Sequence, residues 1–435
     1  MEAIVTCFLV KKPRAQSLLT FMLLLGIDVG TSSVKVSVVD AATQRSLTSA
    51  QYPDTESKIT SLQPGWAEQS PQMWWEHTIQ AVKRVNASGA FNPRDIGASG
   101  IAYQMHGLVL VDEHQQVLRD SIIWCDSRAV PYGQKAQDHI SPETCFAGML
   151  NSPGNFTAAK LAWVKENEPE TFARIFKIML PGDYIAMKLT GDIATTVPAL
   201  SEGIFWDFRK DQVSEKVMAF FGFSMDIIPD IKPLFSEHGR VRPEVAGLLD
   251  LKAGIPVAYK SGDQPNNALS LNVLNPGEVA ATAGTSGVIY AVSDQLTYDP
   301  QSRVNTFAHV NYTPEVKRVG MLMNINGAGI MNSWVRENLG HGMDYEQMNA
   351  EAGKVAVGSK GLRILPFGNG AERVLNNRII GAQFHYLDFN VHSRAHVFRA
   401  VQEGIAFTFR YGLDIMRNNG INPKVIRAGY TNMFR

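Results

Sequence analysis

The sequence predicts an α/β protein built from two related domains, and three observations support this. The chain has 435 residues, about three times the length of a typical domain. A strand, a Gly-Thr-Ser turn and a second strand occur at Gly30 and again at Gly284, 254 positions later. Elsewhere, short apolar segments typical of strands alternate with segments of helical periodicity. A repeat this far apart indicates a duplicated domain rather than an array of short repeats.

Composition excludes several classes of protein. Lys+Arg and Asp+Glu number 41 each, so the formal net charge is +0, which disfavours nucleic-acid binding through bulk charge. Cys7, Cys125 and Cys145 cannot form a disulfide framework and contain no C-x-x-C pair, so neither a secreted scaffold nor a structural zinc site is expected. Mean hydropathy is −0.09, and no apolar run reaches the roughly 18 residues that a membrane span needs. We expect a soluble, cytoplasmic protein that binds neither nucleic acid nor membrane.

The first 22 residues have an unusual order of charge and hydropathy. The basic run Lys11-Lys12-Pro13-Arg14 stands between two apolar patches, whereas a secretory signal places its basic residues first and a cleavage site after the apolar run. We therefore predict that residues 1–22 are a non-native or unstructured extension and that the first domain begins near Met22. A functional leader is the alternative.

The two Gly-Thr-Ser turns are candidates for phosphate binding. Each lies in a strand–turn–strand segment, residues 23–40 and 279–294, and an aspartate follows each turn glycine by ten positions. Such a turn presents backbone N–H groups and a hydroxyl, which suit a phosphate. A single turn of this kind is more often an ordinary hairpin, but two matching turns can hold a polyphosphate between them.

The two turns differ in one residue that matters for chemistry. Asp28 precedes the first turn glycine by two positions, and Thr282 occupies that place in the second segment. One carboxylate suits Mg²⁺ bound to a nucleotide, because Mg²⁺ takes few protein ligands and keeps several waters. The chain has no Walker-type loop and no G-x-G-x-x-G loop opening a helix, so P-loop and Rossmann folds are disfavoured.

The segment between the turns predicts mixed α/β structure. Ser70-Pro71 is a cap and first-turn proline for an amphipathic helix. A strand at 96–102 leads into Tyr103-Gln104-Met105-His106-Gly107, and a strand at 256–259 leads to Gly262-Asp263-Gln264. Loops at such strand ends are where α/β proteins place their chemistry. Further strands are expected at 109–112 and 122–124, and helical spacing dominates from about 141 to 221.

These segments together resemble the FGGY carbohydrate kinases, and among them the xylulokinase branch. The paired turns, the Gln104-Met105-His106-Gly107 segment and the segment SGDQPNNA (261–268) carry the resemblance. Supporting stretches are QPGWAEQ (63–69), IWCDSR (123–128) and FTAAKLAW (156–163). The resemblance extends from about Leu23 to the last residue.

The resemblance implies a two-domain actin-like, ribonuclease-H-like ATPase fold. The implied domains are 23–272, which binds sugar and phosphate and carries the catalytic aspartate, and 273–435, which binds the nucleotide. The implied reaction is transfer of the γ-phosphoryl group of ATP to a ketopentose. The first candidate for this sugar is D-xylulose, which would give D-xylulose 5-phosphate. The implied cofactors are ATP and Mg²⁺, and the implied binding partners are the sugar and MgATP. A homodimer is a possible assembly.

The resemblance also assigns the site residues. Asp263 matches the catalytic base, and a turn aspartate after a strand is the alternative. Met105 and His106 match the sugar contacts, although a buried histidine satisfied by the backbone would look the same. Asp28 matches the aspartate near Mg²⁺. Four further residues are expected to contact the sugar: Gln264, Trp66, Trp124 and Phe156. Each of the three aromatic residues is also compatible with a role in packing alone. The residues expected to contact ATP are Gly30, Thr31, Ser32, Gly284, Thr285, Ser286, Gly329, Gly429 and Asn432.

Three alternatives stay open at this point. The acceptor is also compatible with ribulose, fuculose, rhamnulose or a polyol. Only 152 residues run from Gly284 to Arg435, so the second domain is expected to be truncated at its C-terminus, and a catalytically impaired sugar-binding homologue is a second interpretation. An actin-like ATPase is the third, although the segments at Gln104 and Asp263 have no purpose in it.

Overall fold

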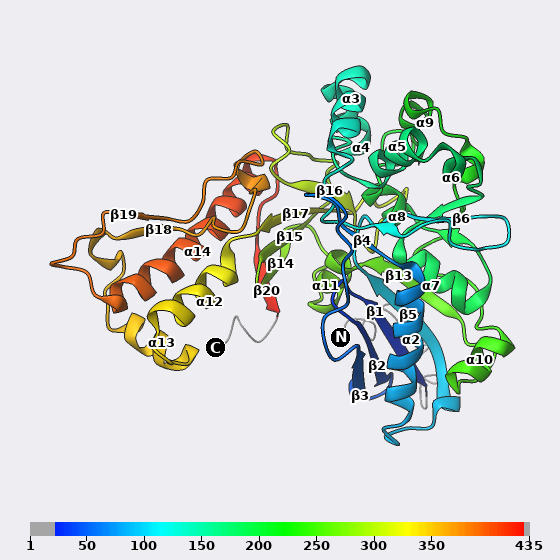
Figure 1. The fold of residues 1–435 in the computed structure, drawn as a ribbon, viewed down its shortest axis with the longest axis horizontal. Helices are drawn as coiled ribbons and strands as arrows, with labels where there is room; N and C mark the ends of the chain where they lie inside the picture. Colours follow the sequence, from blue (N-terminus) through cyan, green and yellow to red (C-terminus); the bar gives the residue numbers. More distant parts are fainter. Residues whose placement is uncertain (1–21, 430–435) are drawn as a thin grey trace. The chain divides into compact units, whose positions relative to one another are not determined.

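The structure is a computed structural model that describes residues 22–429. Within these residues the chain forms two compact units (Figure 1). One contains residues 22–272 together with Phe307–Arg318, and the other contains residues 273–306 and 319–429. The predicted boundaries at 23–272 and 273–435 stay predictions. The extension predicted at 1–22 lies outside the described residues except for Met22, whose carbonyl accepts the Ala41 N–H.

The first unit is built on a five-stranded sheet in the order β13-β5-β1-β2-β3. β1 pairs antiparallel with β2 and parallel with β5, and β13 adds parallel to β5. β1 lies at the centre of this sheet and buries both of its faces, which explains its apolar sequence. The strands are β1 (Leu23–Val29), β2 (Val34–Asp40), β3 (Arg45–Tyr52), β5 (Ile96–Tyr103) and β13 (Val257–Gly262).

The helix predicted after Ser70 is confirmed as α2 (Pro71–Asn86), which packs on β2 and β3 (Figure 1). Ser70 is the N-cap, its side-chain oxygen accepts the Met73 N–H, and Pro71 stands in the first turn where its missing N–H costs nothing. Trp74 lies on the buried face of the helix, within the same hydrophobic core as the inward side chains of β1 and β2. This packing fixes the frame on which the strand ends are presented.

The remaining elements of the first unit surround the sheet and its carboxyl edge. The helices are α3 (Val130–Ile140), α4 (Pro142–Met149), α5 (Thr157–Asn167), α6 (Pro169–Ala173), α7 (Pro181–Thr190), α8 (Val197–Glu202), α9 (Glu215–Phe221), α10 (Pro243–Leu249) and α11 (Asp263–Ser270). The short strands are β4 (Glu68–Gln69), β6 (Val109–Val111), β7 (Ser121–Ile122), β8 (Lys177–Met179), β9 (Ala194–Thr195), β10 (Trp206–Asp207), β11 (Gln212–Val213) and β12 (Asp230–Ile231).

The second unit has a five-stranded sheet in the order β16-β17-β15-β14-β20. Its strands are β14 (Glu278–Ala283), β15 (Gly287–Ser293), β16 (Asn305–Ala308), β17 (Val319–Ile325) and β20 (Val425–Gly429). β14 pairs antiparallel with β15 and parallel with β20, as β1 pairs with β2 and β5. Four strands therefore repeat the topology of the first unit. The other elements are α12 (Ala328–Leu339), α13 (Tyr345–Gly353), α14 (Arg394–Asn418), β18 (Arg363–Leu365) and β19 (Gln383–His385).

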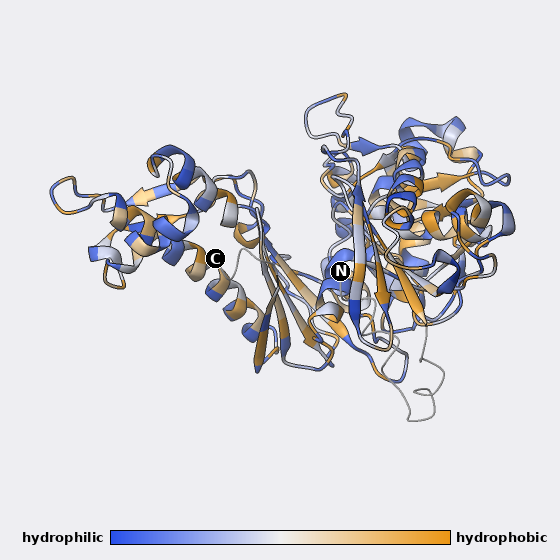
Figure 2. Cartoon of the chain, turned by 90° about the horizontal axis from the view of Figure 1, so that it is seen from below, coloured by the Kyte–Doolittle hydropathy of each residue, from blue (hydrophilic) through white to orange (hydrophobic). Residues whose placement is uncertain are grey.

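Each sheet supports a separate hydrophobic core. Figure 2 shows hydrophobic residues along the central strands of both units. None of the helices within residues 22–429 combines the length and hydropathy needed to cross a bilayer.

Two sequence predictions need correction. The strand expected at 122–124 is β7, Ser121–Ile122, because the backbone turns beyond Ile123 and the Asp126 N–H closes that turn on the Ile123 carbonyl. The loop expected at 262–264 is absent, since β13 ends at Gly262 and Asp263 begins α11 directly. Asp263 is thus held by a helix N-terminus rather than by a mobile turn.

Candidate active site

Three parallel strands of the first unit end at the same edge of the sheet. Val29 at the end of β1 is in register with Tyr103 at the end of β5, and Tyr103 is in register with Gly262 at the end of β13. The residues that follow each strand therefore emerge side by side. This edge brings together Asp28, the segment Gln104–His106 and Asp263, which the sequence predicted as site residues from three distant segments.

The two aspartates at this edge influence each other. Burial raises the pKa of Asp263 to about 7, with the negative charge of Asp28 as the next cause, while hydrogen bonds around Gln264 lower it. Burial also raises the pKa of Asp28, opposed by Lys35 on the paired strand β2. A carboxyl group titrating near neutrality can accept a proton from a bound hydroxyl.

The two aspartates also fit a site for Mg²⁺. Partial burial raises the pKa of both aspartates and the charge of Asp28 raises that of Asp263 further, so a divalent cation held by Asp28 would favour their ionised forms. Within residues 22–429 no cluster of three or more His, Cys, Asp or Glu side chains is arranged for a metal. Two carboxylates completed by phosphate oxygens and water are the usual environment of nucleotide-bound Mg²⁺.

His106 is held through both its backbone and its ring. It adopts φ +63°, a left-handed conformation that is costly for a non-glycine residue. Its carbonyl accepts from Lys160 Nζ at 2.9 Å and from Thr157 Oγ1 at 3.3 Å. Its Nδ1 lies 3.1 Å from the Glu202 carbonyl. A carbonyl only accepts, so Nδ1 carries a proton, and when the ring is neutral Nε2 is an acceptor, which suits a sugar hydroxyl.

Aromatic rings enclose the imidazole. The ring centroid of Phe156 is 4.9 Å from that of His106 in an edge arrangement, and that of Phe307 is 5.4 Å away. Phe156 was predicted on the sugar side and lies beside a predicted sugar contact. Phe307 was not foreseen, because it lies far along the chain, within β16, where the segment Phe307–Arg318 of the first unit begins.

Met105 is buried beside the start of α11. A Cβ at Gly262 would lie 2.7 Å from Met105 Cγ and 2.7 Å from Glu202 Oε2. Only glycine leaves room for both side chains at this point. Glycine at 262 therefore lets Asp263 follow its strand without displacing its neighbours, while Gln264 occupies the next position of α11.

The first Gly-Thr-Ser turn is tied down by side chains. The Gly30 N–H donates to the Ser33 carbonyl, and the Ser32 carbonyl accepts the Ser57 N–H. The Thr31 hydroxyl donates to Gln104 Oε1 at 3.1 Å and accepts from Trp124 Nε1 at 2.9 Å. The sequence predicts that this turn presents free backbone N–H groups and a hydroxyl to a phosphate. The structure instead commits the Gly30 N–H and the Thr31 proton to holding the turn.

Two glutamines complete this arrangement. Gln69 Nε2 donates to the Thr31 carbonyl at 2.8 Å, and its Oε1 accepts from Gln104 Nε2 and Trp74 Nε1. The turn, α2 and the end of β5 are thus joined in one hydrogen-bond network. Trp124 was predicted to line the sugar site, and its indole N–H contacts the turn.

The second turn is tied down by main chain. Gly284 N–H donates to the Ser286 carbonyl, and the Thr285 carbonyl accepts the Ile330 N–H. A Cβ at Gly329 would lie 1.8 Å from the Gly284 carbonyl oxygen. Gly329, predicted near the nucleotide, therefore packs the first turn of α12 directly on the second Gly-Thr-Ser turn.

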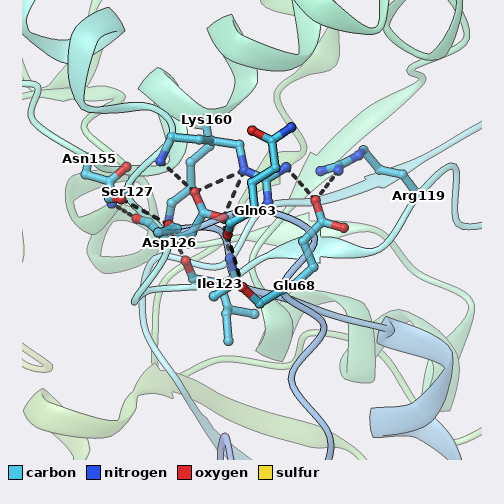
Figure 3. A network of polar contacts seen from close by, with 12 residues as sticks. Gln63, Glu68, Arg119, Ile123, Asp126, Ser127, Asn155 and Lys160 are labelled. Atoms are coloured by element: carbon cyan, nitrogen blue, oxygen red, sulfur yellow. Dashed lines mark hydrogen bonds and ion pairs between the residues drawn. The ribbon is translucent and has the colours of Figure 1, made fainter.

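Trp66 lies in a charged and aromatic cluster of the first unit. The guanidinium carbon of Arg128 lies 3.8 Å from the Trp66 ring centroid, and Trp163 meets Trp66 edge-on at 5.2 Å. Arg128 also pairs with Asp126 at 2.7 Å and Glu68 at 2.5 Å. Figure 3 shows Glu68, Arg119 and Asp126 within this network. These contacts fix the orientation of the Trp66 ring. The position of Trp66 in the cluster is compatible both with a role in packing and with contact to the sugar.

One of the last two predicted ATP contacts stands at the end of the described chain. Gly429 is the last residue of β20 and is in register with Thr282 of β14. Asn432 lies outside the described residues. Thr282 occupies the position in β14 that Asp28 occupies in β1, so Gly429 corresponds to Ala102 of β5 in the first unit.

Comparison with known proteins agrees with this architecture. The model of the N-terminal domain of the FGGY family of carbohydrate kinases matches residues 23–270, and that of the C-terminal domain matches residues 279–429. The chain belongs to this family. The prediction of a two-domain α/β fold of this family is confirmed, as is that of a phosphotransferase with an alcohol acceptor; enzymes of the FGGY family use ATP with Mg²⁺.

Individual relatives of the FGGY family extend along most of the chain. The xylulose kinase of Escherichia coli (strain K12) is 30% identical over 403 residues, 92% of this chain and 80% of that protein. The xylulose kinase of Bacillus subtilis (strain 168) is 29% identical over 409 residues, 91% of this chain and 78% of that protein. The crystal structure of a xyloylose kinase from Brucella ovis superposes with a TM-score of 0.83 at 27% identity, covering 94% of this chain and 82% of that one.

Proposed function

We propose that this protein transfers the γ-phosphoryl group of MgATP to D-xylulose, giving D-xylulose 5-phosphate. The single observation that carries the proposal is that the segments bearing His106 and Asp263 leave the ends of the adjacent parallel strands β5 and β13. One offers an acceptor for sugar hydroxyls, and the other offers a carboxyl group that titrates near neutrality. Relatives named xylulose kinase at about 30% identity support the choice of sugar.

In the proposed mechanism each side chain has one task. His106 and Met105 orient the acceptor, with Phe156, Trp66 and Trp124 on the sugar side. Asp263 receives the proton of the attacking hydroxyl, and this proton leaves late because the transition state is loose.

Phosphate contacts come from both turns in this proposal. Backbone groups of Gly30–Ser32 and Gly284–Ser286 face the phosphates, while Gly329, Gly429 and Asn432 lie toward the nucleoside. Asp28 would hold Mg²⁺, which when bound neutralises charge on the phosphates. Positioning and charge neutralisation then supply most of the acceleration, as expected for phosphoryl transfer.

A substrate panel tests the proposal. The full chain is assayed with MgATP and D-xylulose, D-ribulose, L-fuculose, L-rhamnulose or glycerol, and ADP release is measured in a coupled assay. We expect the highest kcat/KM for D-xylulose, by about tenfold or more, since small pocket differences are worth that much. A higher value for another sugar would reassign the substrate. Sugar binding without ADP release would favour a sugar-binding homologue instead.

Two finer predictions accompany this function. The enzyme is proposed to act in the cytoplasm and to form a homodimer. Light scattering on the purified full chain measures the mass directly, and a mass near 47.9 kDa would contradict the dimer.

A further inference from the structure

Glu202 is a buried acidic residue that the sequence analysis did not single out. It is the last residue of α8, and only 2% of it is exposed. A buried carboxyl group needs hydrogen-bond partners or a countercharge to be tolerated. Its surroundings therefore show what it contributes to the strand-end edge.

Glu202 contacts both N–H groups of His106. Its carboxylate oxygen Oε1 lies 3.4 Å from the backbone nitrogen of His106, and its own carbonyl lies 3.1 Å from Nδ1. One residue thereby fixes the backbone and the ring of a histidine held at φ +63°. Since this conformation costs free energy in a free chain, the contacts from Glu202 help to keep it.

The same side chain reaches the start of α11. Oε2 lies 2.7 Å from the position that a Cβ at Gly262 would take, next to Met105 Cγ. Glu202 therefore stands between the segment after β5, which carries His106, and the segment after β13, which carries Asp263.

Charge around Glu202 is predominantly negative. Burial raises the pKa of Glu202 well above its ordinary value, and Asp263 and Asp183 raise it further, whereas Lys160 and the His106 N–H lower it. A carboxyl oxygen accepts from the His106 N–H whether or not the group is ionised.

We propose that Glu202 is a positioning residue of the acceptor site, which sets His106 for the sugar and joins it to the segment bearing Asp263. This inference rests on the proposed function. It assigns Glu202 an effect on sugar binding and not on nucleotide binding. If Glu202 had a purely structural role, its substitution would instead lower stability and change the KM for the sugar and the KM for MgATP to a similar extent.

The test compares variants of two neighbouring buried residues in the full chain. Glu202→Ala removes the carboxyl group, and Ser201→Ala removes a hydroxyl that is equally buried but accepts from the Ala308 N–H. For Glu202→Ala we expect the KM for D-xylulose to rise about tenfold, the value of one lost buried hydrogen bond, with the KM for MgATP within about twofold. Ser201→Ala should leave the ratio of the two constants unchanged.

Two further variants keep the test decisive if Glu202→Ala does not fold. Glu202→Gln retains a side-chain oxygen of the same length and should restore the sugar KM to within about threefold, while Glu202→Asp, one methylene shorter, should not. The inference would be overturned if Glu202→Gln and Glu202→Asp had the same KM for D-xylulose. It would also be overturned if Glu202→Ala raised the KM for D-xylulose and the KM for MgATP in parallel. If the unmodified chain phosphorylates no sugar, the proposed function fails and the inference with it. If that chain is active and Glu202→Ala keeps its sugar KM, only the inference fails.

Discussion

The turn between β1 and β2 and the turn between β14 and β15 occupy the same place in two sheets of the same topology. The first encloses four residues between Val29 and Val34, and the second encloses three between Ala283 and Gly287. Side chains of Gln69, Gln104 and Trp124 fix the first, whereas the main chain at the start of α12 fixes the second.

The two units share a sheet topology but carry different side chains at equivalent positions. In the first unit the carboxyl edge carries Asp28 and Asp263 with pKa values raised by burial. In the second unit Thr282 stands in place of Asp28 and is in register with Gly429. This asymmetry supports placing the proposed acid–base chemistry in the first unit and only phosphate contacts in the second. Substitutions at equivalent positions should accordingly have unequal consequences.

The largest effect is expected for Asp263→Asn. Removing the base should lower kcat by about 10²- to 10⁴-fold, the usual contribution of a positioned general base, while the affinity for D-xylulose stays within about tenfold. Thr282→Val, at the second turn, is the control and should retain most activity. Turnover of Asp263→Asn near that of the unmodified chain would remove Asp263 as the base.

Asp28→Asn should lower turnover by about a hundredfold, since it removes the carboxylate proposed to hold Mg²⁺, and it should also move the pH profile. The base has to be deprotonated, so kcat/KM is low below the pKa of Asp263, about 7, and rises as pH increases through it. Without the Asp28 charge that raises this pKa, the acid limb should shift to lower pH. An acid limb that stays in place would show that the two carboxyl groups are not coupled.

Gly329→Ala should act on the nucleotide side only. The new Cβ would lie 1.8 Å from the Gly284 carbonyl oxygen, so the second turn has to move, and we expect the KM for MgATP to rise about tenfold. The sugar KM should stay unchanged. Gly353→Ala is the matched control, because no atom lies within 4 Å of its Cβ position and alanine favours helix α13. Equal behaviour of the two variants would contradict main-chain fixation of the turn.

The smallest effect is expected for Trp124→Phe. The variant loses the hydrogen bond from the indole N–H to the Thr31 hydroxyl, but this tryptophan is 50% exposed, so water can replace the donor. We expect the KM for MgATP to rise by about threefold at most. A change confined to the sugar KM would instead support the predicted role of Trp124 in lining the sugar site.

The sequence by itself determined the features that are local or repeated. The Ser70-Pro71 start of α2, the alternation in β2, the two Gly-Thr-Ser turns and the asymmetry of Asp28 against Thr282 all depend on residues within a few positions of one another. The same holds for Asp263 directly after an apolar strand. Periodicity, capping and turn chemistry act over such distances, so one chain reveals them.

Only the tertiary structure decided which distant residues meet. Glu202 and Phe307 contact His106, and Gln69 contacts Thr31, although 96, 201 and 38 positions separate the members of these pairs. No local pattern signals such contacts, because the register of β1, β5 and β13 and the packing around them create the proximity. Burial of Asp28 and Asp263 side by side follows from the same register, and it is this burial that raises the proton affinity of the proposed base.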